Sequence, residues 1–233
     1  MLSVVPAAVL GFVVGLRHAM DADHVAAVGT IVARERNIRG AALIGAAWGL
    51  GHTLSLLLLG GAIVAFGLVV PRRVGLMMEL GVGVMLLALG VWNFVSRSRA
   101  SATDHAGRHD ARPSSAAASA RPHGDAVSPL RRALRPLVVG SVHGLAGSAA
   151  AALIVVATVS SASWGLVYLF VFGVGTMLGM VVLTTALALP MGRALQRFRG
   201  AESWLRIASG ALSLAIGALV IYQIGFRDGL FLQ

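Results

Sequence analysis

Apolar positions gather into six long stretches, which are separated by short polar segments and one long polar segment. Each stretch is long enough for a helix to cross the hydrocarbon core of a bilayer, which takes about 20 residues. The pattern therefore predicts an all-α integral membrane protein with six transmembrane helices. We place them at about residues 3–31, 40–70, 74–96, 136–159, 163–190 and 202–224.

The composition agrees with a membrane protein rather than with a large soluble domain. Of the 233 residues, 57% are hydrophobic and 12% are charged, whereas soluble domains average about 25% charged residues. The mean hydropathy is +0.84. Because the chain contains no cysteine, the sequence excludes a disulfide framework and any thiolate metal site.

The longest polar segment, residues 97–135, separates two groups of three predicted helices. It is rich in Ser, Ala, Arg and Pro and has no helical or strand period, which is typical of disorder. We therefore predict a first three-helix repeat at residues 1–96, a disordered loop at 97–135 and a second three-helix repeat at 136–233. Three histidines of this loop either buffer metal ions or are solvated side chains without such a role: His105, His109 and His123.

The arginines predict the orientation of the chain in the membrane. The net charge of +10 comes from arginine alone, since there is no lysine. Fifteen of the 19 arginines fall on one side of the six predicted helices, three on the other side, and Arg17 lies within a span. Because positive residues gather on the cytoplasmic side, we expect a plasma-membrane protein with the 97–135 loop in the cytoplasm and both termini outside. This topology explains the basic charge without a nucleic-acid partner.

The two halves of the chain resemble each other. FVVGLRHAMDADHVAAVGTIVA (12–33) and LVVGSVHGLAGSAAAALIVVAT (137–158) share VVGxxH, so His18 matches His143. Glycines of the later spans also match at similar offsets: Gly49 and Gly51 with Gly173 and Gly175, and Gly83 and Gly90 with Gly210 and Gly217. A three-span repeat must reverse its orientation in the second copy, so we predict an inverted 3+3 repeat. Secondary transporters often have this organisation, with the substrate site near the midplane.

The stretch HAMDADH, which starts at His18, places two histidines and two aspartates in an otherwise apolar span. A charged side chain at the centre of a membrane helix costs about 2.5–3.5 kcal/mol, so such groups are usually paired or functional. On a straight helix His18, Asp21 and His24 share one face, and Asp23 lies about 140° from His18. Asp23 joins the same site only if the helix unwinds there. Arg17 lies one turn before Asp21, and we expect a structural ion pair between them.

The second span adds His52, at a depth similar to that of His18. Imidazole and carboxylate ligands without thiolate suit Ni²⁺, Co²⁺ or Zn²⁺, and Cu²⁺ or Fe²⁺ less well. The predicted metal ligands are His18, Asp21, Asp23, His24 and His52. The second half has lost every charge of the motif, so we expect a single asymmetric site.

Only weaker ligands are available from the second half: His143, Ser148, Thr176, Met177 and Met180. A lone histidine in a membrane helix is often only a hydrogen-bonding group between helices. Because His143 has no charged neighbour along the chain, the sequence favours that role for it.

Two of these stretches resemble a known family. RHAMDADHV (17–25) is similar to the signature RHAxDADHI of the nickel/cobalt transporter (NiCoT) family, and GLGHTLS (49–55) is similar to its second signature, a Gly-His-Ser/Thr. The resemblance implies that His18, Asp23, His24 and His52 lie on a metal path. It covers the first two spans strongly, about a quarter of the chain.

The second half departs from the larger members of that family, which carry acidic motifs of the types DTATE and DTxD. The corresponding stretches here, HGLAGSAAAAL (143–153) and FGVGTMLGM (172–180), hold no carboxylate. The short form with HGLAGSAAA resembles the urease-accessory-type membrane proteins of the same superfamily.

We therefore expect a secondary permease that takes up Ni²⁺ or Co²⁺, with the ion as substrate, no prosthetic group and no enzyme activity. One alternative is a metal-sensing or metal-delivery accessory protein for a metalloenzyme such as urease, with maturation proteins as partners. Others are a metal efflux permease and a membrane acyltransferase, since His18-x₄-Asp23 also fits a His–Asp spacing used in general-base catalysis. The acyltransferase alternative leaves His24 and His52 without a role.

Overall fold

The computed structural model describes residues 4–33, 35, 37–106, 133–146, 161–198 and 200–232, and every regular element among them is helical. The predicted contributor Ser148 lies outside the described residues, as do most of the 97–135 loop and the later part of the span at 136–159. The all-α prediction is confirmed for the described parts of the chain.

The first predicted span is divided into two helices, α1 (Val4–His18) and α2 (Ala22–Val32). Residues 19–21 form a tight turn between them, and Asp21 is extended (φ −61°, ψ 150°) at the N-cap of α2, a position that Asp favours. Its carboxylate makes no capping hydrogen bond because it is bound to His18 instead. The helix predicted over 3–31 is thus broken at residues 19–21, inside the HAMDADH motif, where the sequence required unwinding for Asp23 to join the site.

The second predicted span is one continuous helical element. It begins at Ile38, slightly before the predicted start at about residue 40. It consists of α3 (Ile38–Ser55), a π-helical turn η1 (Leu56–Gly60) and α4 (Gly61–Phe66). Asn37 caps its start by accepting a hydrogen bond from the Arg39 backbone N–H. Gly67 ends it with a φ of +61°, a left-handed conformation that glycine adopts without a steric cost.

The third element, α5 (Arg72–Ala106), is longer than its predicted span. It continues past residue 96 to Ala106, so the first part of the predicted disordered loop is helical. The sequence offers a reason: residues 97–106 contain neither Gly nor Pro, and Gly107 follows at once.

The second half begins with a helix at 133–146 and continues with α7 (Ala162–Arg197) and α8 (Ala201–Tyr222). A π-helical turn, η2 (Gln223–Arg227), extends α8. All three helices overlap the spans predicted for them.

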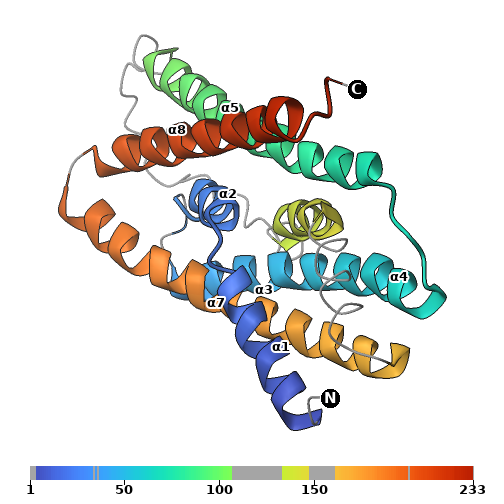
Figure 1. The fold of residues 1–233 in the computed structure, drawn as a ribbon. Helices are drawn as coiled ribbons and strands as arrows, with labels where there is room; N and C mark the ends of the chain where they lie inside the picture. Colours follow the sequence, from blue (N-terminus) through green and yellow to red (C-terminus); the bar gives the residue numbers. More distant parts are fainter. Residues whose placement is uncertain are drawn as a thin grey trace.

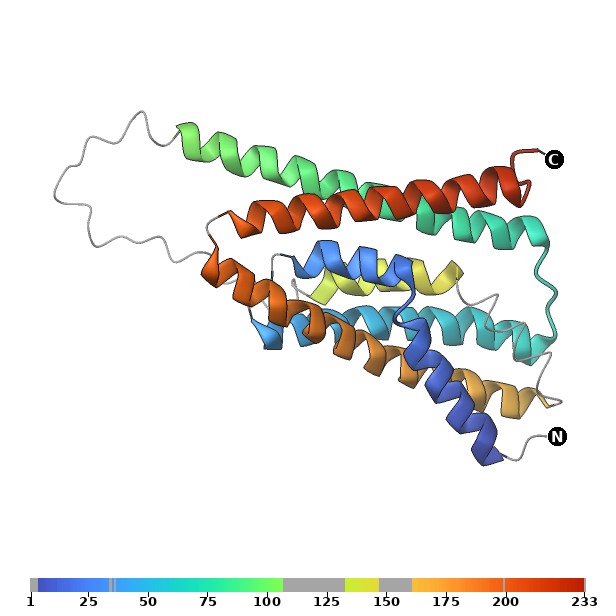
Figure 2. The same ribbon diagram turned by 60° about the vertical axis from the view of Figure 1, so that its left-hand side comes forward.

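The helices form a layered bundle, in which α5 and α8 run side by side on one face (Figure 1). On the other face α7 packs against both α1 and α3. Figure 2 shows α2 and the helix at 133–146 between these two layers, and both termini at the same end of the bundle. The break after α1 thus lets α2 enter the middle layer, where a straight helix could not go.

Glycines bring these helices into close contact. A Cβ atom on Gly15 of α1 would meet the carbonyl oxygen of Phe172 in α7, and one on Gly175 of α7 would meet that of Phe12. The helix at 133–146 contacts α3 in the same way, since a Cβ atom on Gly140 would meet the carbonyl oxygen of Trp48 and one on Gly51 that of Leu137. Small residues at such crossings allow the backbones of membrane helices to touch.

Four helical elements are long and apolar enough to cross a membrane: Ile38–Phe66, Arg72–Val95, Ala162–Arg197 and Ser203–Arg227. Two shorter apolar helices, Ala8–His18 and Ala22–Val32, make up the broken first span. Large hydrophobic side chains such as Leu58, Phe66 and Trp204 are exposed, as expected for a surface that faces lipid. The chain is therefore a multi-pass membrane protein.

Candidate metal centre

Four histidines from four helical segments meet where the first span is broken. His18 ends α1, His24 lies in the first turn of α2, His52 lies in the last turn of α3, and His143 comes from the helix at 133–146. The ring centroids of His24 and His143 are 4.1 Å apart, those of His18 and His24 are 4.7 Å apart, and those of His18 and His52 are 5.3 Å apart. The histidines thus form one compact cluster.

The cluster is buried, and most of its ring nitrogens have no protein partner. His24 and His52 are fully buried, and His143 is 3% exposed. Among the described residues, six buried ring nitrogens lack a hydrogen-bond partner: Nε2 of His18, both nitrogens of His24, both of His52, and Nδ1 of His143. Buried polar atoms normally have partners, because leaving one unpaired costs about 1–3 kcal/mol. Their concentration here indicates a ligand-binding site.

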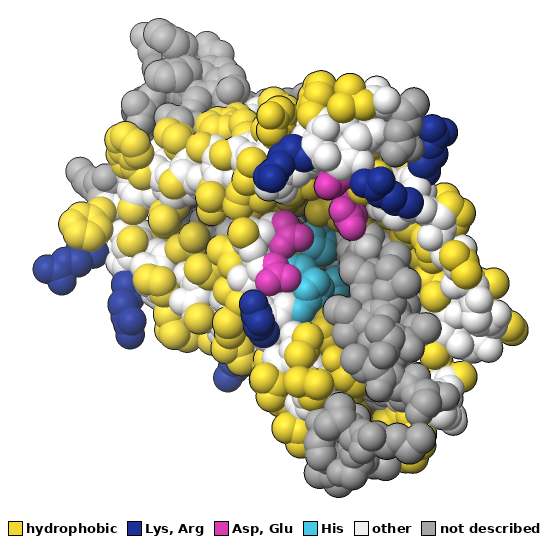
Figure 3. Space-filling view, in the orientation of Figure 1, with side chains coloured by type: hydrophobic (Ala, Val, Ile, Leu, Met, Phe, Trp, Pro, Cys, Tyr) yellow, Lys and Arg dark blue, Asp and Glu magenta, His cyan; other side chains and the backbone are white. Residues whose placement is uncertain are grey.

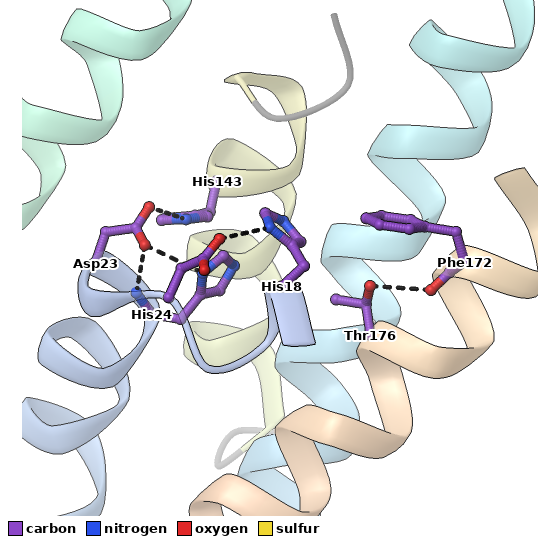
Figure 4. A network of polar contacts seen from close by, with 7 residues as sticks. His18, Asp23, His24, His143, Phe172 and Thr176 are labelled. Carbon is purple, nitrogen blue, oxygen red and sulfur yellow. Dashed lines mark hydrogen bonds and ion pairs between the residues drawn. The ribbon is translucent and has the colours of Figure 1, made fainter. Parts of the chain in front are cut away.

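Asp23 contacts two of the four histidines, one from each half of the chain. Its Oδ2 atom lies 3.0 Å from Nε2 of His143, and its Oδ1 atom lies 3.3 Å from Nδ1 of His24. Oδ1 also accepts a hydrogen bond of 3.0 Å from the backbone N–H of His24 (Figure 4). The carboxylate therefore connects the first half of the chain to His143 of the second half.

Asp21 occupies a different place from Asp23. It is exposed, and its Oδ2 atom lies 2.9 Å from Nδ1 of His18. This contact fixes the ring of His18 so that Nε2 is left for a ligand, which is the usual role of a carboxylate behind a metal-binding histidine. Asp21 thus supports His18 from the edge of the cluster, although helical geometry had put it beside His18 and His24 as a ligand.

The potential ligand atoms fall into two overlapping groups. One group consists of His18, His24 and His52, and the other consists of Asp23, His24 and His143. Within each group the ligand atoms lie within 4.8 Å of one another. Three ligand atoms bound to one metal at about 2.1 Å lie about 3.0–3.6 Å apart, so each group would have to contract by up to about 1–2 Å to hold an ion. His24 belongs to both groups.

The weaker second-half candidates have other contacts. The Thr176 hydroxyl donates a hydrogen bond of 2.9 Å to the carbonyl oxygen of Phe172, whose ring centroid lies 5.5 Å from that of His18. Met180 is fully buried in an apolar cluster, and Met177 packs against Gly49. Their positions place Thr176 nearest to the histidines and the two methionines in the packing of α7 against α3.

His143 is the residue whose role the sequence underestimated. Its only sequence signal is the VVGxxH match with His18, and the absence of charged neighbours along the chain pointed to simple helix packing. The charged neighbour, Asp23, instead comes from another helix, 3.0 Å away. The internal repeat was therefore the better guide to this residue.

Two pairings expected from the sequence are not formed. Arg17 is exposed, and among the described residues Asp21 pairs with His18 rather than with Arg17, because the turn at residues 19–21 interrupts the helical spacing. Asp23 contacts His24 and His143, and among the described residues it does not pair with His18, the pair on which the acyltransferase alternative depends.

The comparison with known families covers nearly the whole bundle. Residues 7–219 match a family described as the cytochrome C biogenesis protein transmembrane region. This chain belongs to that family. Family membership agrees with the helical membrane architecture and gives no indication of an enzyme.

A curated relative in this comparison is the urease accessory protein UreH of Bacillus sp. (strain TB-90). It is 33% identical over 225 residues, which cover 95% of this chain and 93% of the relative. No solved structure matches the chain. The likeness of the RHAMDADHV and GLGHTLS motifs to the NiCoT family stays a prediction.

Proposed function

We propose that this protein moves a divalent transition-metal ion, Ni²⁺ or Co²⁺, across the membrane through the histidine cluster. The observation that supports this most directly is the set of six ring nitrogens without a hydrogen bond, on three buried histidines and the half-buried His18 at the break of a membrane helix. Nitrogen and carboxylate ligands without thiolate suit these ions. Because the ion is cargo, the site must bind it and also release it.

The reciprocal glycine contacts support an inverted 3+3 repeat. Gly15 meets Phe172 and its sequence match Gly140 meets Trp48, while Gly51 meets Leu137 and its match Gly175 meets Phe12. The third pair of spans follows the same rule: Gly83 approaches Gly217, and Gly90 approaches Gly210. Each contact thus has a counterpart with the halves exchanged, as a two-fold axis in the membrane plane requires. The histidine cluster would then lie at the repeat interface, where transporters of this kind bind substrate.

We propose further that the two ligand groups are two successive positions of one ion. The Asp23–His24–His143 group contains the carboxylate, while the His18–His24–His52 group contains the fully buried His52. Because His24 serves both groups, an ion can pass between them without losing every protein ligand. Protons that compete for the imidazoles would assist release.

The inverted halves supply a means of access to each side of the membrane in turn. The first half contributes Asp23, His24 and His52, and the second contributes His143. Rocking of one half against the other would change the distance between His143 and the rest of the cluster. Such rocking would open and close the position that contains Asp23.

Nickel is the ion we favour, because the relative's printed name refers to urease, a nickel enzyme. That name also fits a second function, in which the protein is a membrane accessory protein that senses or delivers the metal without transporting it. Both functions need the metal site, and only the first needs net flux of the ion.

The test is flux of ⁶³Ni or ⁵⁷Co into proteoliposomes that contain the purified protein. We expect wild-type flux to be lost in His18→Ala and in His52→Ala. The control is Ser213→Ala, which removes a buried hydroxyl that donates to the Leu86 carbonyl, far from the histidines along the chain. Metal binding without flux in the wild type would replace the permease with the accessory function. Flux that survives both histidine substitutions would remove the site from the path.

Equilibrium binding of Co²⁺ in detergent tests the two positions separately. If each group holds the ion, His52→Ala and His143→Ala should each leave the other group able to bind it. The double variant should then lose far more affinity than the two single losses combined. Additive losses would instead mean that all four histidines hold one ion at one position.

A further inference from the structure

A cavity of about 250 Å³ leads from the histidine cluster toward the end of the bundle that carries both termini. At its inner end it is lined by His18, Asp23 and His143. Farther out it is lined by Glu79 of α5 and by Gln223 and Asp228 at the end of α8. Figure 3 shows histidine side chains at the base of a hollow, with acidic side chains beside them.

Glu79 is the acidic residue that stands out in this cavity, because it lies inside a membrane span. It is seven residues into α5, or about 10 Å from the helix start at Arg72. No other acidic residue occurs in the span Arg72–Val95. An acidic side chain within a membrane span is expensive and is usually kept for a function.

The outer carboxylates are not neutralised by arginine. Within the parts of the chain that the structure describes, neither Glu79 nor the side chain of Asp228 has an ion-pair partner, and no arginine lines the cavity. Arg72 is engaged at the backbone, since it donates a hydrogen bond of 2.9 Å to the carbonyl oxygen of Asp228. Among the described residues, no ion pair therefore occupies the two carboxylates that line the outer part of the cavity.

A second observation points to a cation in this space. Nδ1 of His143 and Nε2 of His18, from residues that line the inner end, are buried without a hydrogen-bond partner among the described residues. His143 is 3% exposed. The cavity thus runs from two unpaired carboxylates to unpaired imidazole nitrogens, which is a sequence of groups that a divalent cation would contact as it loses water.

The volume suits an ion that still carries its water. A water molecule occupies about 30 Å³ in the liquid, so 250 Å³ holds about eight. A divalent cation with an octahedral shell of six waters therefore fits. The carboxylates can hold such an ion through its waters before the histidines replace them.

A second cavity, of about 410 Å³, provides a contrast. It is lined by Thr30, Leu89, Trp92 and Arg135, among others, and none of its described lining residues carries a carboxylate. The Arg135 guanidinium lies 5.0 Å from the centre of the Trp92 ring. The first cavity therefore presents carboxylates to an occupant, whereas the second presents a guanidinium.

We propose that the first cavity is a cation vestibule, in which Glu79 and Asp228 capture a hydrated divalent cation from the side of the membrane that carries both termini and pass it to Asp23 and His143. This inference rests on the proposed function, and it adds the capture site and the side of entry. If the arginine-rich side is cytoplasmic, the ion enters from outside, which is the direction of uptake.

The rate of Co²⁺ binding tests the capture step without requiring transport. Stopped-flow absorbance of Co²⁺ in detergent should show association slowed about 10-fold by Glu79→Gln and by Asp228→Asn at low ionic strength, and much less at high ionic strength. The equilibrium affinity should stay within about 2-fold, because neither residue belongs to the histidine groups. Glu35→Gln, which removes one charge near the opposite end of the first half, should leave the rate unchanged.

The inference would be overturned if Glu79→Gln and Asp228→Asn bound Co²⁺ as fast as the wild type. It would also be overturned if Glu35→Gln slowed binding as much as they do. The proposed function fails separately, if wild-type protein binds Co²⁺ but shows no flux in proteoliposomes. In that case the association rates still decide whether the vestibule exists.

The side of entry has its own test, which the absence of native cysteine makes direct. In the Glu79→Cys variant, a membrane-impermeant thiol reagent should react from the side of the termini only, and Co²⁺ should slow the reaction. Reaction from the arginine-rich side, or a rate that Co²⁺ leaves unchanged, would contradict the proposal.

Discussion

Gly15 and Gly140 occupy matching places in the two halves of the chain, and their surroundings match as well. Each presses its helix against a backbone carbonyl of the next element, that of Phe172 for Gly15 and that of Trp48 for Gly140. Three residues further on both halves have a histidine, but the residues that follow it differ. His18 is followed by Asp21, Asp23 and His24, whereas His143 is followed by Ala146, Ser148 and Ala149.

This difference distinguishes residues that set the spacing of the helices from residues that could bind a ligand. Glycines at the crossings set the spacing of the helices, and they are kept in both halves because both crossings need the same close approach. The proposed cation would need only one set of ligands, so under the proposed function imidazoles and carboxylates are needed once. His52 illustrates the same division, since it follows Gly51 as Thr176 follows Gly175.

The largest expected effect concerns a histidine that only the first half has. His24→Ala removes the one residue shared by both ligand groups, and we expect Co²⁺ affinity to fall on the order of 1000-fold, beyond the 10–100-fold cost of losing a supporting residue. Calorimetric titration in detergent measures this. An affinity within about 10-fold of wild type would show that the two groups do not depend on His24.

The next substitution makes the first half resemble the second. In His52→Thr a threonine follows Gly51, as a threonine follows Gly175 in the second half. Only the Asp23–His24–His143 group then stays complete. We expect binding to weaken by no more than about 10-fold, while ⁶³Ni flux falls more than about 100-fold because the ion has no second position. If binding and flux fell in parallel, the idea of successive positions would be wrong.

A pair of substitutions tests the structural side of the comparison. Gly15→Ala and Gly140→Ala each place a methyl group against a backbone carbonyl, and such overpacking costs about 1–3 kcal/mol. Both should lower the apparent melting temperature in detergent by a similar amount, on the order of 5 °C. Gly81→Ala is the matched control, because its Cβ atom would meet nothing within 4 Å. A large inequality between Gly15→Ala and Gly140→Ala would mean that the crossings are not equivalent.

The smallest expected effect concerns Asp21, which has no charged counterpart in the second half. Asp21→Asn weakens the hold on Nδ1 of His18, and we expect Co²⁺ affinity to fall about 10-fold without loss of the fold. Asp21→Glu, which keeps the charge, should recover part of the affinity. If Asp21→Asn lowered affinity as much as His24→Ala, Asp21 would have to be a direct ligand.

The sequence was a good guide to the helices and a partial guide to the site. Apolar stretches identify membrane helices because each must bury about 20 residues in lipid, and the predicted spans overlap the observed helices. The angle between Asp23 and His18 also gave the right condition, that Asp23 joins the cluster only where the helix is broken. The sequence could not show that the break exists.

What the sequence missed depends on contacts between distant segments. His143, which the sequence offered only as a weaker candidate, contacts Asp23, 120 positions earlier in the chain, and helical geometry within one span carries no information about that contact. Glu79 had a signal, as the lone carboxylate of its span, but its neighbours in the cavity come from α8 and from the helix at 133–146. Asp21 shares a face with His24 on a straight helix and loses that face in the turn.

The break between α1 and α2 has an electrostatic consequence of its own. An α-helix carries a partial negative charge at its C-terminus and a partial positive charge at its N-terminus. α1 ends at His18 and α2 begins at Ala22, so two ends of opposite sign meet beside the cluster. The end of α1 favours a cation next to His18, and the start of α2 favours the ionised form of Asp23 in its first turn. At the proposed ion site, backbone dipoles would thus supply part of the field that holds the ion, without adding another charged residue to the membrane.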